Sequence, residues 1–305
     1  MEEWIKILGD LVRENLFRKS FPLPADSSIC TKWAEGLRRG GRRVLYTSCM
    51  YQLAPLIARA VELLERSGAS AGGLRAKLTG LGARLLGGLA LRPSEEDLEW
   101  AQRVLKNIAG MLAKAGVEFG VLDDEPYSGA LLYELGFEDD FAEYAKRVYK
   151  YFKDKGVEEV ITVDPHTHYT LEKVYPKYVD GFDIRVTNYM DYIRPARASV
   201  DKVVIHDSCL YARYLDRYDV YRRLLDSVKV QHVEDPYVTG RAYSGCCGGP
   251  VESVRPDVAK SVAKLRVGQL AKLSNIVITV CPICYVNLSR AGGGVKIYDL
   301  AEVLS

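Results

Sequence analysis

Short apolar runs alternate with amphipathic segments along most of the chain, the pattern expected of strands that alternate with helices. Buried strands are predicted at residues 44–47, 117–122, 160–163, 203–206, 228–233, 276–280 and 296–298. Apolar residues at helical spacing predict helices at residues 54–66, 95–115, 142–155, 211–226 and 258–273, with Ser94 as the N-cap of the second. Strands and helices in this order are typical of parallel sheets covered on both faces. We therefore expect an α/β fold.

Two segments depart from this alternation. Apolar residues between Trp4 and Val12 have helical spacing, and prolines 22 and 24 then interrupt it, so residues 1–43 are predicted to form a short helical lead. The basic cluster between residues 38 and 43 is typical of a solvated linker. The segment from about residue 67 to residue 93 is rich in Gly and Ala, and its apolar residues show little periodicity. This predicts a helical hairpin or a mobile insertion.

The two halves of the chain can be aligned with each other, which indicates an internal repeat. Tyr46-Thr-Ser-Cys49-Met-Tyr51 matches His206-Asp-Ser-Cys209-Leu-Tyr211, and Tyr127-Ser128-Gly129 aligns with Cys246-Cys247-Gly248. Asp164-Pro165-His-Thr167 aligns with Cys281-Pro282-Ile-Cys284. We therefore predict two tandem Rossmann-like repeats with mainly parallel sheets, related by a pseudo-two-fold axis, over residues 44–199 and 200–305. The matched loops follow strand ends, where ligands bind in open α/β sheets.

Composition removes several functional classes without proposing one. The chain has 305 residues with 42 basic and 40 acidic side chains, a formal charge of +2, which argues against a dedicated nucleic-acid binder. No apolar run reaches the roughly 18–20 residues of a membrane span, and no secretory signal is visible at the N-terminus. We therefore expect a cytoplasmic protein.

Cysteine usage points to a redox or metal site. Five of the seven cysteines lie after residue 208, as Cys209, the adjacent pair Cys246-Cys247, and the Cys281-x-x-Cys284 motif. Five thiolates exceed the four that a tetrahedral zinc ion needs, and an adjacent pair suits a larger cluster with separate irons. The spacing therefore favours an iron–sulfur cluster, with zinc in the same site as the alternative. Cys30 is isolated, which is typical of a packing residue.

The C-terminal cysteine pattern closely resembles the cysteine-rich CCG domain. That domain is found in the catalytic subunit of heterodisulfide reductase and in iron–sulfur subunits of glycolate, lactate and glycerol-3-phosphate oxidising systems, in which two such domains typically occur in tandem. The motif is complete in the second repeat of this chain. In the first repeat it is degenerate, retaining Cys49 and the stretch Asp164-Pro-His-Thr-His168.

The resemblance implies a cofactor and partners. Cys209, Cys246, Cys247, Cys281 and Cys284 would hold a non-cubane [4Fe-4S] cluster at which a small disulfide or thiol substrate is reduced or formed. Gly248 and Gly249 would let backbone amides approach the sulfurs. Motifs for cubane clusters of the ferredoxin type are absent from the sequence, so electrons would be exchanged with a ferredoxin-like iron–sulfur subunit or a flavin subunit.

Polar residues beside the aligned motifs are further candidates. His206 and Asp207 precede Cys209, and we predict a catalytic role for them, with His206 as a hydrogen-bond donor or proton source. In the first repeat, Cys49, Asp164, His166 and His168 are predicted to bind zinc, to line the substrate cleft together with Tyr127, or to have a structural role only.

Three functions fit these observations. The first is a heterodisulfide-reductase-like oxidoreductase subunit with one cluster in the second repeat. The second is an electron-transfer subunit whose flavoprotein partner oxidises a hydroxy acid or glycerol phosphate. The third is a binding protein that zinc stabilises.

Overall fold

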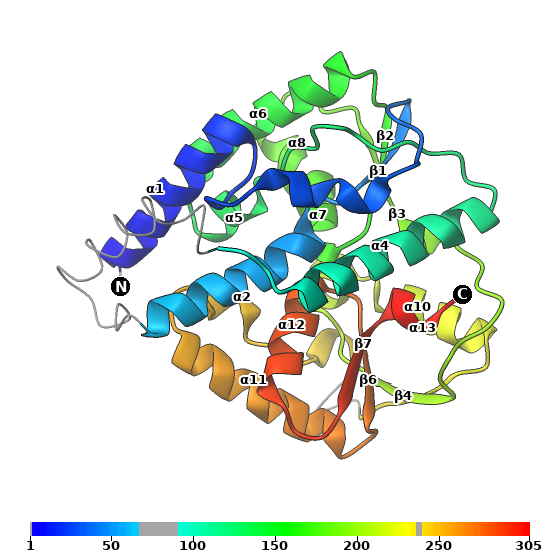
Figure 1. Ribbon diagram of the computed structural model, residues 1–305. Coiled ribbons are helices and arrows are strands. Elements are labelled where there is room, and N and C mark those ends of the chain that lie inside the picture. Colours follow the sequence, from blue (N-terminus) through cyan, green and yellow to red (C-terminus); the bar gives the residue numbers. More distant parts are fainter. Residues whose placement is uncertain (1, 67–90, 236–239) are drawn as a thin grey trace.

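The computed structural model describes residues 2–66, 91–235 and 240–305, which form two parallel sheets with helices around them (Figure 1). The first sheet has the order β1-β2-β3, and the second has the order β5-β4-β6-β7. Their bounds are Arg43–Tyr46 for β1, Glu159–Thr162 for β2, Arg185–Asn188 for β3, Lys202–Ile205 for β4, Gln231–Val233 for β5, Ile276–Thr279 for β6 and Lys296–Asp299 for β7. All pairs within the two sheets are parallel, which confirms the predicted α/β class.

Longer helices cover the sheets, and shorter ones follow the strand ends. In chain order the α-helices are α1 Glu2–Lys19, α2 Met50–Arg66, α4 Glu95–Lys114, α5 Ala130–Glu134, α6 Glu138–Asp154, α7 Pro165–Tyr169, α8 Tyr175–Tyr178, α9 Tyr189–Tyr192, α10 Tyr218–Ser227, α11 Pro256–Ala271, α12 Pro282–Ala291 and α13 Leu300–Val303. Short 3₁₀ segments are η1 Ser27–Cys30, η2 Lys32–Ala34, η6 Arg241–Tyr243 and η7 Gly249–Val251, and π turns are η4 Thr170–Val174 and η5 Leu210–Tyr214. Among the described residues, none of these helices has the length and apolarity to cross a membrane.

Backbone geometry at equivalent positions supports the predicted internal repeat. Gly129 and Gly248 both adopt positive φ, at 84° and 91°, where a side chain would be strained. Asp164 and Cys281 both sit at the N-cap of a helix that starts with proline, α7 in the first repeat and α12 in the second. The strand order β1-β2-β3 also repeats as β4-β6-β7. Equivalent loops therefore follow equivalent strands in the two halves.

The two halves share a core and are joined by a reciprocal pair of buried hydrogen bonds. Asn188 and Asp299 end the equivalent strands β3 and β7, and each caps the short helix that follows through a capping box. The Tyr51 hydroxyl donates to Asp299 over 2.9 Å, and the Asn188 amide donates to the Tyr211 hydroxyl over 2.5 Å. Each repeat thus places its tyrosine on the cap of the other repeat. Apolar residues from both sheets, such as Ile161 and Ile278, belong to one buried cluster.

Several predicted elements differ from the structure. Residues 117–122 do not form a strand of the sheet; Gly120 and Val121 make only isolated parallel bridges, to Val44 and to Arg39, at the edge where the second sheet has β5. The helix predicted at 211–226 is divided into η5 and α10, and β5 is shorter than the predicted 228–233 strand. Strand β3 was not predicted, because its side chains are mostly half-buried or exposed and lack an apolar run. Most of the predicted insertion, residues 67–90, lies outside the described residues.

Replacement of Asp299 by asparagine should remove part of the pH dependence of stability. Burial raises the pKa of Asp299 to about 7 from an ordinary value of 3.8. When a carboxyl has a raised pKa in the folded state, the free energy of unfolding is greatest below its pKa in the unfolded state. It falls as the pH rises up to and through the folded-state pKa. Between about pH 4 and pH 7, D299N should therefore gain on the order of a few kcal/mol in unfolding free energy relative to the wild type. Asn188 shows that an amide fits the equivalent cap.

Urea unfolding of both proteins at several pH values checks this expectation. The quantity to compare is the difference between the proteins, because other carboxyls with raised pKa values, such as Glu125, remain in the variant. A difference that stays constant from pH 4 to pH 7 would show that Asp299 does not titrate in this range.

Candidate functional site

The five C-terminal cysteines meet beyond the carboxyl ends of β4 and β6. Cys209 lies four residues after β4 and immediately before η5, and Cys281 is the N-cap of α12, which carries Cys284 in its first turn. Cys246 and Cys247 come from the loop between η6 and η7. Cys247, Cys281 and Cys284 are buried, whereas Cys209 and Cys246 are partly exposed. This confirms the predicted position of the loops at strand ends.

The sulfur atoms interact directly with one another. Cys247 hydrogen-bonds to the side chains of Cys246 and Cys284, and Cys284 also hydrogen-bonds to Cys281. Burial raises the pKa of Cys209, and the nearby charges of Cys281 and Cys247 raise it further. Among the described residues, His206, Cys247 and Cys284 form a group whose ligand atoms lie within 4.8 Å of one another. The loops therefore bring Cys246, Cys247, Cys281 and Cys284 into contact and place Cys209 near them.

Hydrogen bonds within the group lower the pKa values of some thiols and raise those of others. Hydrogen bonds from Cys246 and then Cys284 lower the pKa of Cys247 well below its usual range, against the effect of burial. Burial raises the pKa of Cys281, but hydrogen bonds from Cys284 and His166 outweigh it and lower the pKa to about 6. The same contacts raise the pKa values of Cys246 and Cys284. Two sulfurs thus ionise readily, as metal ligation requires.

The two glycines after the cysteine pair bring backbone amides onto the sulfurs, as the sequence predicted. The Gly248 N–H donates to the Cys246 sulfur over 3.3 Å, and the Gly249 N–H donates to the Cys247 sulfur over 3.4 Å. A Cβ on Gly248 would lie 2.5 Å from the Ala259 carbonyl oxygen, and one on Gly249 would lie 2.4 Å from an Ile283 methyl group. Gly248 therefore requires glycine, because its φ is positive and the obstacle is backbone, whereas a side chain at Gly249 would need Ile283 to move.

His206 faces the sulfurs as a hydrogen-bond donor. The buried guanidinium of Arg266 donates from Nε to His206 Nδ1 over 3.1 Å and from Nη2 to Ser244 over 2.8 Å. Since Nδ1 accepts, the hydrogen-bond network assigns the proton of a neutral imidazole to Nε2. His206 Nε2 is buried without a hydrogen bond of good geometry in the described part of the chain, but His206 lies beside Cys247 and Cys284 and helps to lower the pKa of Cys247. An N–H directed at a sulfur supports a thiolate, whereas a metal-ligating Nε2 would need a free lone pair.

His166 belongs to the first repeat but contacts the cysteine group of the second repeat. It lies at the N-terminal end of α7, where its Nδ1 is 2.6 Å from the Glu134 carboxylate, and it also hydrogen-bonds to Cys281. Burial opposes a charge on His166, but Glu134 and Cys281 outweigh it and raise its pKa well above the usual range. The predicted lining of the second-repeat site by the first repeat therefore applies to His166.

Asp207 holds the cysteine loop in place, and its oxygens are occupied by structural partners. Its carboxylate accepts from both terminal nitrogens of Arg222, at 2.7 and 2.9 Å, and from the Tyr221 hydroxyl. It also accepts from the backbone N–H of Arg241, over 2.6 Å, just before the Cys246 loop. These contacts leave no oxygen for acid–base chemistry at the sulfurs, so the geometry favours an anchoring role over the predicted catalytic one.

The zinc site predicted in the first repeat does not form among the described residues. Cys49 is bonded to Cys30 in a disulfide, so neither thiol is a free ligand and Cys30 is not the isolated residue that the sequence indicated. His168 lies 2.8 Å from the Thr162 hydroxyl, in the core of the first repeat. Asp164 caps α7 through Thr167, and burial raises its pKa to about 6.

Tyr127 does not line a cleft, and two functional residues were missed. The Tyr127 ring is buried, and its hydroxyl accepts from the Leu131 N–H over 3.1 Å.

Arg266 and Glu134, which hold His206 and His166, were not predicted because each stands in an ordinary amphipathic stretch with no motif around it. Only their positions in the fold show that they support the sulfur group.

Five cysteines, three of them buried, thus gather at the strand ends of a parallel α/β fold. Residues 203–289 match the model of the family described as cysteine-rich domain (CCG), which agrees with the motif resemblance.

The chain is similar to parts of several longer oxidoreductases, one of which is named iron-sulfur-binding. It is 28% identical over 225 residues to the probable iron-sulfur-binding oxidoreductase FadF of Bacillus subtilis, covering 67% of this chain and 31% of that protein. It is 28% identical to the EtfAB:quinone oxidoreductase of Syntrophomonas wolfei, covering 67% and 32%. It is 26% identical to one of the subunits of the fumarate reductase (CoM/CoB) of Methanothermobacter marburgensis, covering 64% and 41%. The chain thus spans about a third of the length of most of the curated relatives it matches.

Among solved structures, a hypothetical protein from Helicobacter pylori superposes with a TM-score of 0.48 at 12% identity. The superposition covers 66% of this chain and 44% of that one. A likeness this distant says nothing about function.

The anchoring role of Asp207 predicts a large loss of stability in D207N. The substitution removes the charged bidentate partner of the buried Arg222 guanidinium and leaves it the Glu234 carboxylate, so the loss should be on the order of 2–3 kcal/mol, below that of a fully broken buried ion pair. Urea unfolding measures this loss. E158Q is the matched control, because the Arg42–Glu158 pair is exposed and should contribute less than about 1 kcal/mol. Loss of catalysis without loss of stability in D207N would instead support the catalytic assignment.

Proposed function

We propose that this chain is an iron–sulfur oxidoreductase subunit whose cluster is held by Cys209, Cys246, Cys247, Cys281 and Cys284. The observation that carries the proposal is the direct contact between sulfurs of the Cys246-Cys247 loop and of the Cys281-x-x-Cys284 motif, with Cys209 close to both. The donor set fits such a group, because all five candidate ligands are sulfur and they exceed the four ligands of a tetrahedral zinc ion. The orientation of His206 as a donor further favours a cluster over a zinc site that would use its nitrogen.

The proposed substrate is a small thiol or disulfide. When bound, a thiolate-ligated cluster supplies one-electron chemistry and iron that can accept a substrate sulfur. We infer the non-cubane [4Fe-4S] type from the adjacent cysteine pair and the five-ligand set. The relative that is named fumarate reductase (CoM/CoB) supports thiol chemistry in this group of proteins.

The chain's own residues would then tune and shield the site. Arg266 fixes the His206 tautomer so that its N–H faces Cys247, while Glu134 orients His166 toward Cys281. Hydrogen bonds to ligand sulfurs stabilise the more negative, reduced state of a cluster. A cavity of about 570 Å³ opens between α2, α11 and α12, lined by charged residues such as Lys260 and Arg290. Asn287, which also lines it, lies beside Gly249 of the cysteine loop, so this cavity is our candidate substrate entrance.

The names of two relatives favour a second candidate function. The Syntrophomonas protein is named EtfAB:quinone oxidoreductase, and a Chromohalobacter salexigens relative is named probable membrane-anchored ferredoxin. An electron-transfer subunit that works with a flavoprotein would fit both names. Co-purification of a flavin-containing partner, together with no turnover of thiols or disulfides by the complex, would favour this candidate over the first.

Metal analysis of the anaerobically purified chain tests the cluster assignment. The wild type should contain iron and acid-labile sulfide in similar amounts, and C284S should lose most of both because one buried ligand is missing. C30S is the matched control, since Cys30 lies in the N-terminal lead. Stoichiometric zinc without iron in the wild type would rule out the proposal, as would equal metal loss in C30S and C284S.

The hydrogen bond from His166 predicts a shift in reduction potential. H166Q removes a charged donor to Cys281, so the reduced state is stabilised less and the midpoint potential should move to a lower value. Anaerobic redox titration followed by electron paramagnetic resonance measures the shift. H232Q is the control, because His232 pairs with Asp226 outside the sulfur group. An unchanged or higher potential in H166Q would contradict the role of His166.

A further inference from the structure

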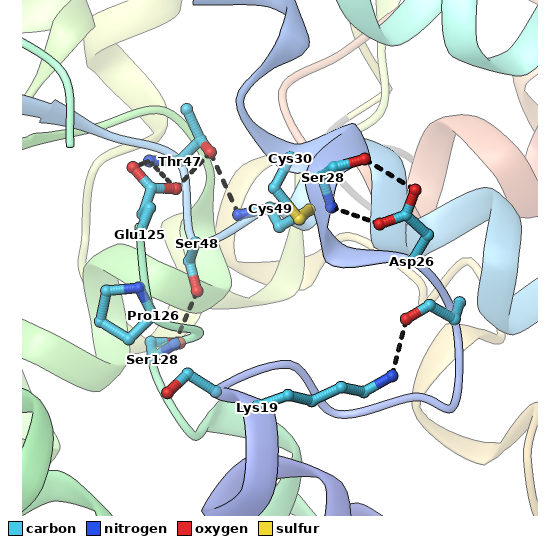
Figure 2. Close-up of a disulfide and its surroundings, with 12 residues drawn as sticks. Lys19, Asp26, Ser28, Cys30, Thr47, Ser48, Cys49, Glu125, Pro126 and Ser128 are labelled. Carbon is cyan, nitrogen blue, oxygen red and sulfur yellow. Dashed lines mark hydrogen bonds between the residues drawn. A yellow bond between two sulfur atoms is a disulfide. The ribbon is translucent and has the colours of Figure 1, made fainter. Parts of the chain in front are cut away.

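A second sulfur site lies in the first repeat, outside the cysteine group. Cys30 at the end of η1 and Cys49 in the loop after β1 form a disulfide that joins the N-terminal lead to the sheet (Figure 2). The proposed function uses neither residue. The two cysteines are separated by 19 positions in the sequence, and both are buried.

The backbone turns Cys49 away from the orientation of its equivalent in the second repeat. Cys49 has φ of +57°, whereas Cys209 at the matching position has φ of −56°. Ser48 also has positive φ, at +51°, and its hydroxyl accepts from the Ser128 N–H over 2.8 Å. Two successive non-glycine residues in the left-handed region are costly, and such conformations persist where the surroundings hold them, often at functional sites. The first repeat thus directs its remaining motif cysteine toward Cys30.

The disulfide borders a cavity that a small molecule can enter. The cavity has a volume of about 570 Å³, and its lining includes Cys30, Thr31 and Glu125. Of the two cysteines, Cys30 is therefore the one that lies on the cavity wall. Cys49 does not line the cavity.

A half-buried carboxyl is linked to the Cys49 backbone through a threonine hydroxyl. The Thr47 hydroxyl donates to Glu125 over 2.6 Å and accepts from the Cys49 N–H over 3.1 Å (Figure 2). Burial raises the pKa of Glu125 to about 7. Protonated and ionised forms of this carboxyl therefore coexist near neutral pH, next to the disulfide and on the wall of the same cavity.

The N-terminal lead does not depend on the disulfide for its attachment. The Tyr127 N–H donates to the Ser20 carbonyl over 2.9 Å, and the Val121 N–H donates to the Arg38 carbonyl over 2.9 Å. Buried residues of the lead, such as Leu16 and Phe21, belong to the apolar cluster of the first repeat. Cleavage of the sulfur–sulfur bond would therefore leave the lead in place.

We propose that Cys30 and Cys49 form a reversible dithiol–disulfide centre that accepts two electrons from a dithiol reductant entering this cavity. A reductant thiolate attacks the Cys30 sulfur, forms a mixed disulfide and displaces Cys49 as a thiolate, which takes up a proton. The second reductant thiol, on losing its proton, then displaces Cys30. The reductant leaves as a disulfide and the protein holds two thiols, so electrons and protons balance. Glu125 is the positioning residue, because through Thr47 it holds the backbone of Cys49 in place.

Peptide-resolved alkylation of the folded full-length chain tests this proposal. The oxidised protein is equilibrated with dithiothreitol, alkylated and digested with trypsin, which places Cys30 on residues 20–32 and Cys49 on residues 44–59, apart from the other five cysteines. We expect both thiols to become labelled together while circular dichroism stays unchanged, and both to be protected again after oxidised dithiothreitol is added.

Two results would overturn the proposal. Labelling that appears only in denaturant would show that the disulfide is a structural link that no reductant reaches in the folded chain. Free thiols that never pair under oxidised dithiothreitol would show that the bond does not form. Since the wild-type chain is used, neither result depends on whether a variant folds.

The part assigned to Glu125 has its own comparison. E125Q should be reduced several-fold more slowly than the wild type at pH 7, with unchanged circular dichroism. D124N is the matched control, because Asp124 lines the same cavity without a hydrogen bond to Thr47, and its reduction rate should equal that of the wild type. Equal rates in E125Q and D124N would remove Glu125 from the centre. The site uses no residue of the cysteine group, so its failure would leave the proposed function untouched.

Discussion

The burial of several sulfur atoms in mutual contact is the constraint on which the rest of this structure depends. Thiolates repel one another and lose hydration when they are buried, so they need positive charge and N–H donors close by. The chain supplies these from three directions: backbone amides at Gly248 and Gly249, the Arg266–His206 pair, and the Glu134–His166 pair. A cluster of iron ions would complete this compensation from the centre.

Parallel sheets explain why the ligands can come from distant parts of the sequence. The loops after β4 and β6 emerge at the same edge, so Cys209 and Cys281 meet although 72 positions separate them. The first repeat has the same loops in the same places, yet Asp164 stands where Cys281 stands in the second repeat. The first repeat therefore has the same arrangement of strands and loops but different side chains at the ligand positions. The first repeat now contributes His166 to the sulfur group and holds a disulfide of its own.

Much of this was predictable from the sequence, because apolar strands and aligned motifs record what each loop must hold. The α/β class followed from the apolar strands. The repeat and the position of the five cysteines followed from motif residues such as Cys247 and Gly248. The Cys30–Cys49 bond was not predictable, because Cys30 belongs to neither repeat and only the fold brings it to Cys49. Arg266 was missed for a similar reason, since its partners His206 and Ser244 lie 60 and 22 positions away. Long-range partners of single polar residues leave no periodic signal.

The central claim is that the sulfur group holds an iron–sulfur cluster that reacts with thiols or disulfides. Electron paramagnetic resonance of the anaerobic wild-type chain, recorded with and without added small disulfides, tests it most directly. The account predicts an iron–sulfur signal whose shape or intensity changes when the disulfide is added, because a substrate sulfur alters the cluster environment. A protein with stoichiometric zinc and no paramagnetic signal under any redox condition would contradict it.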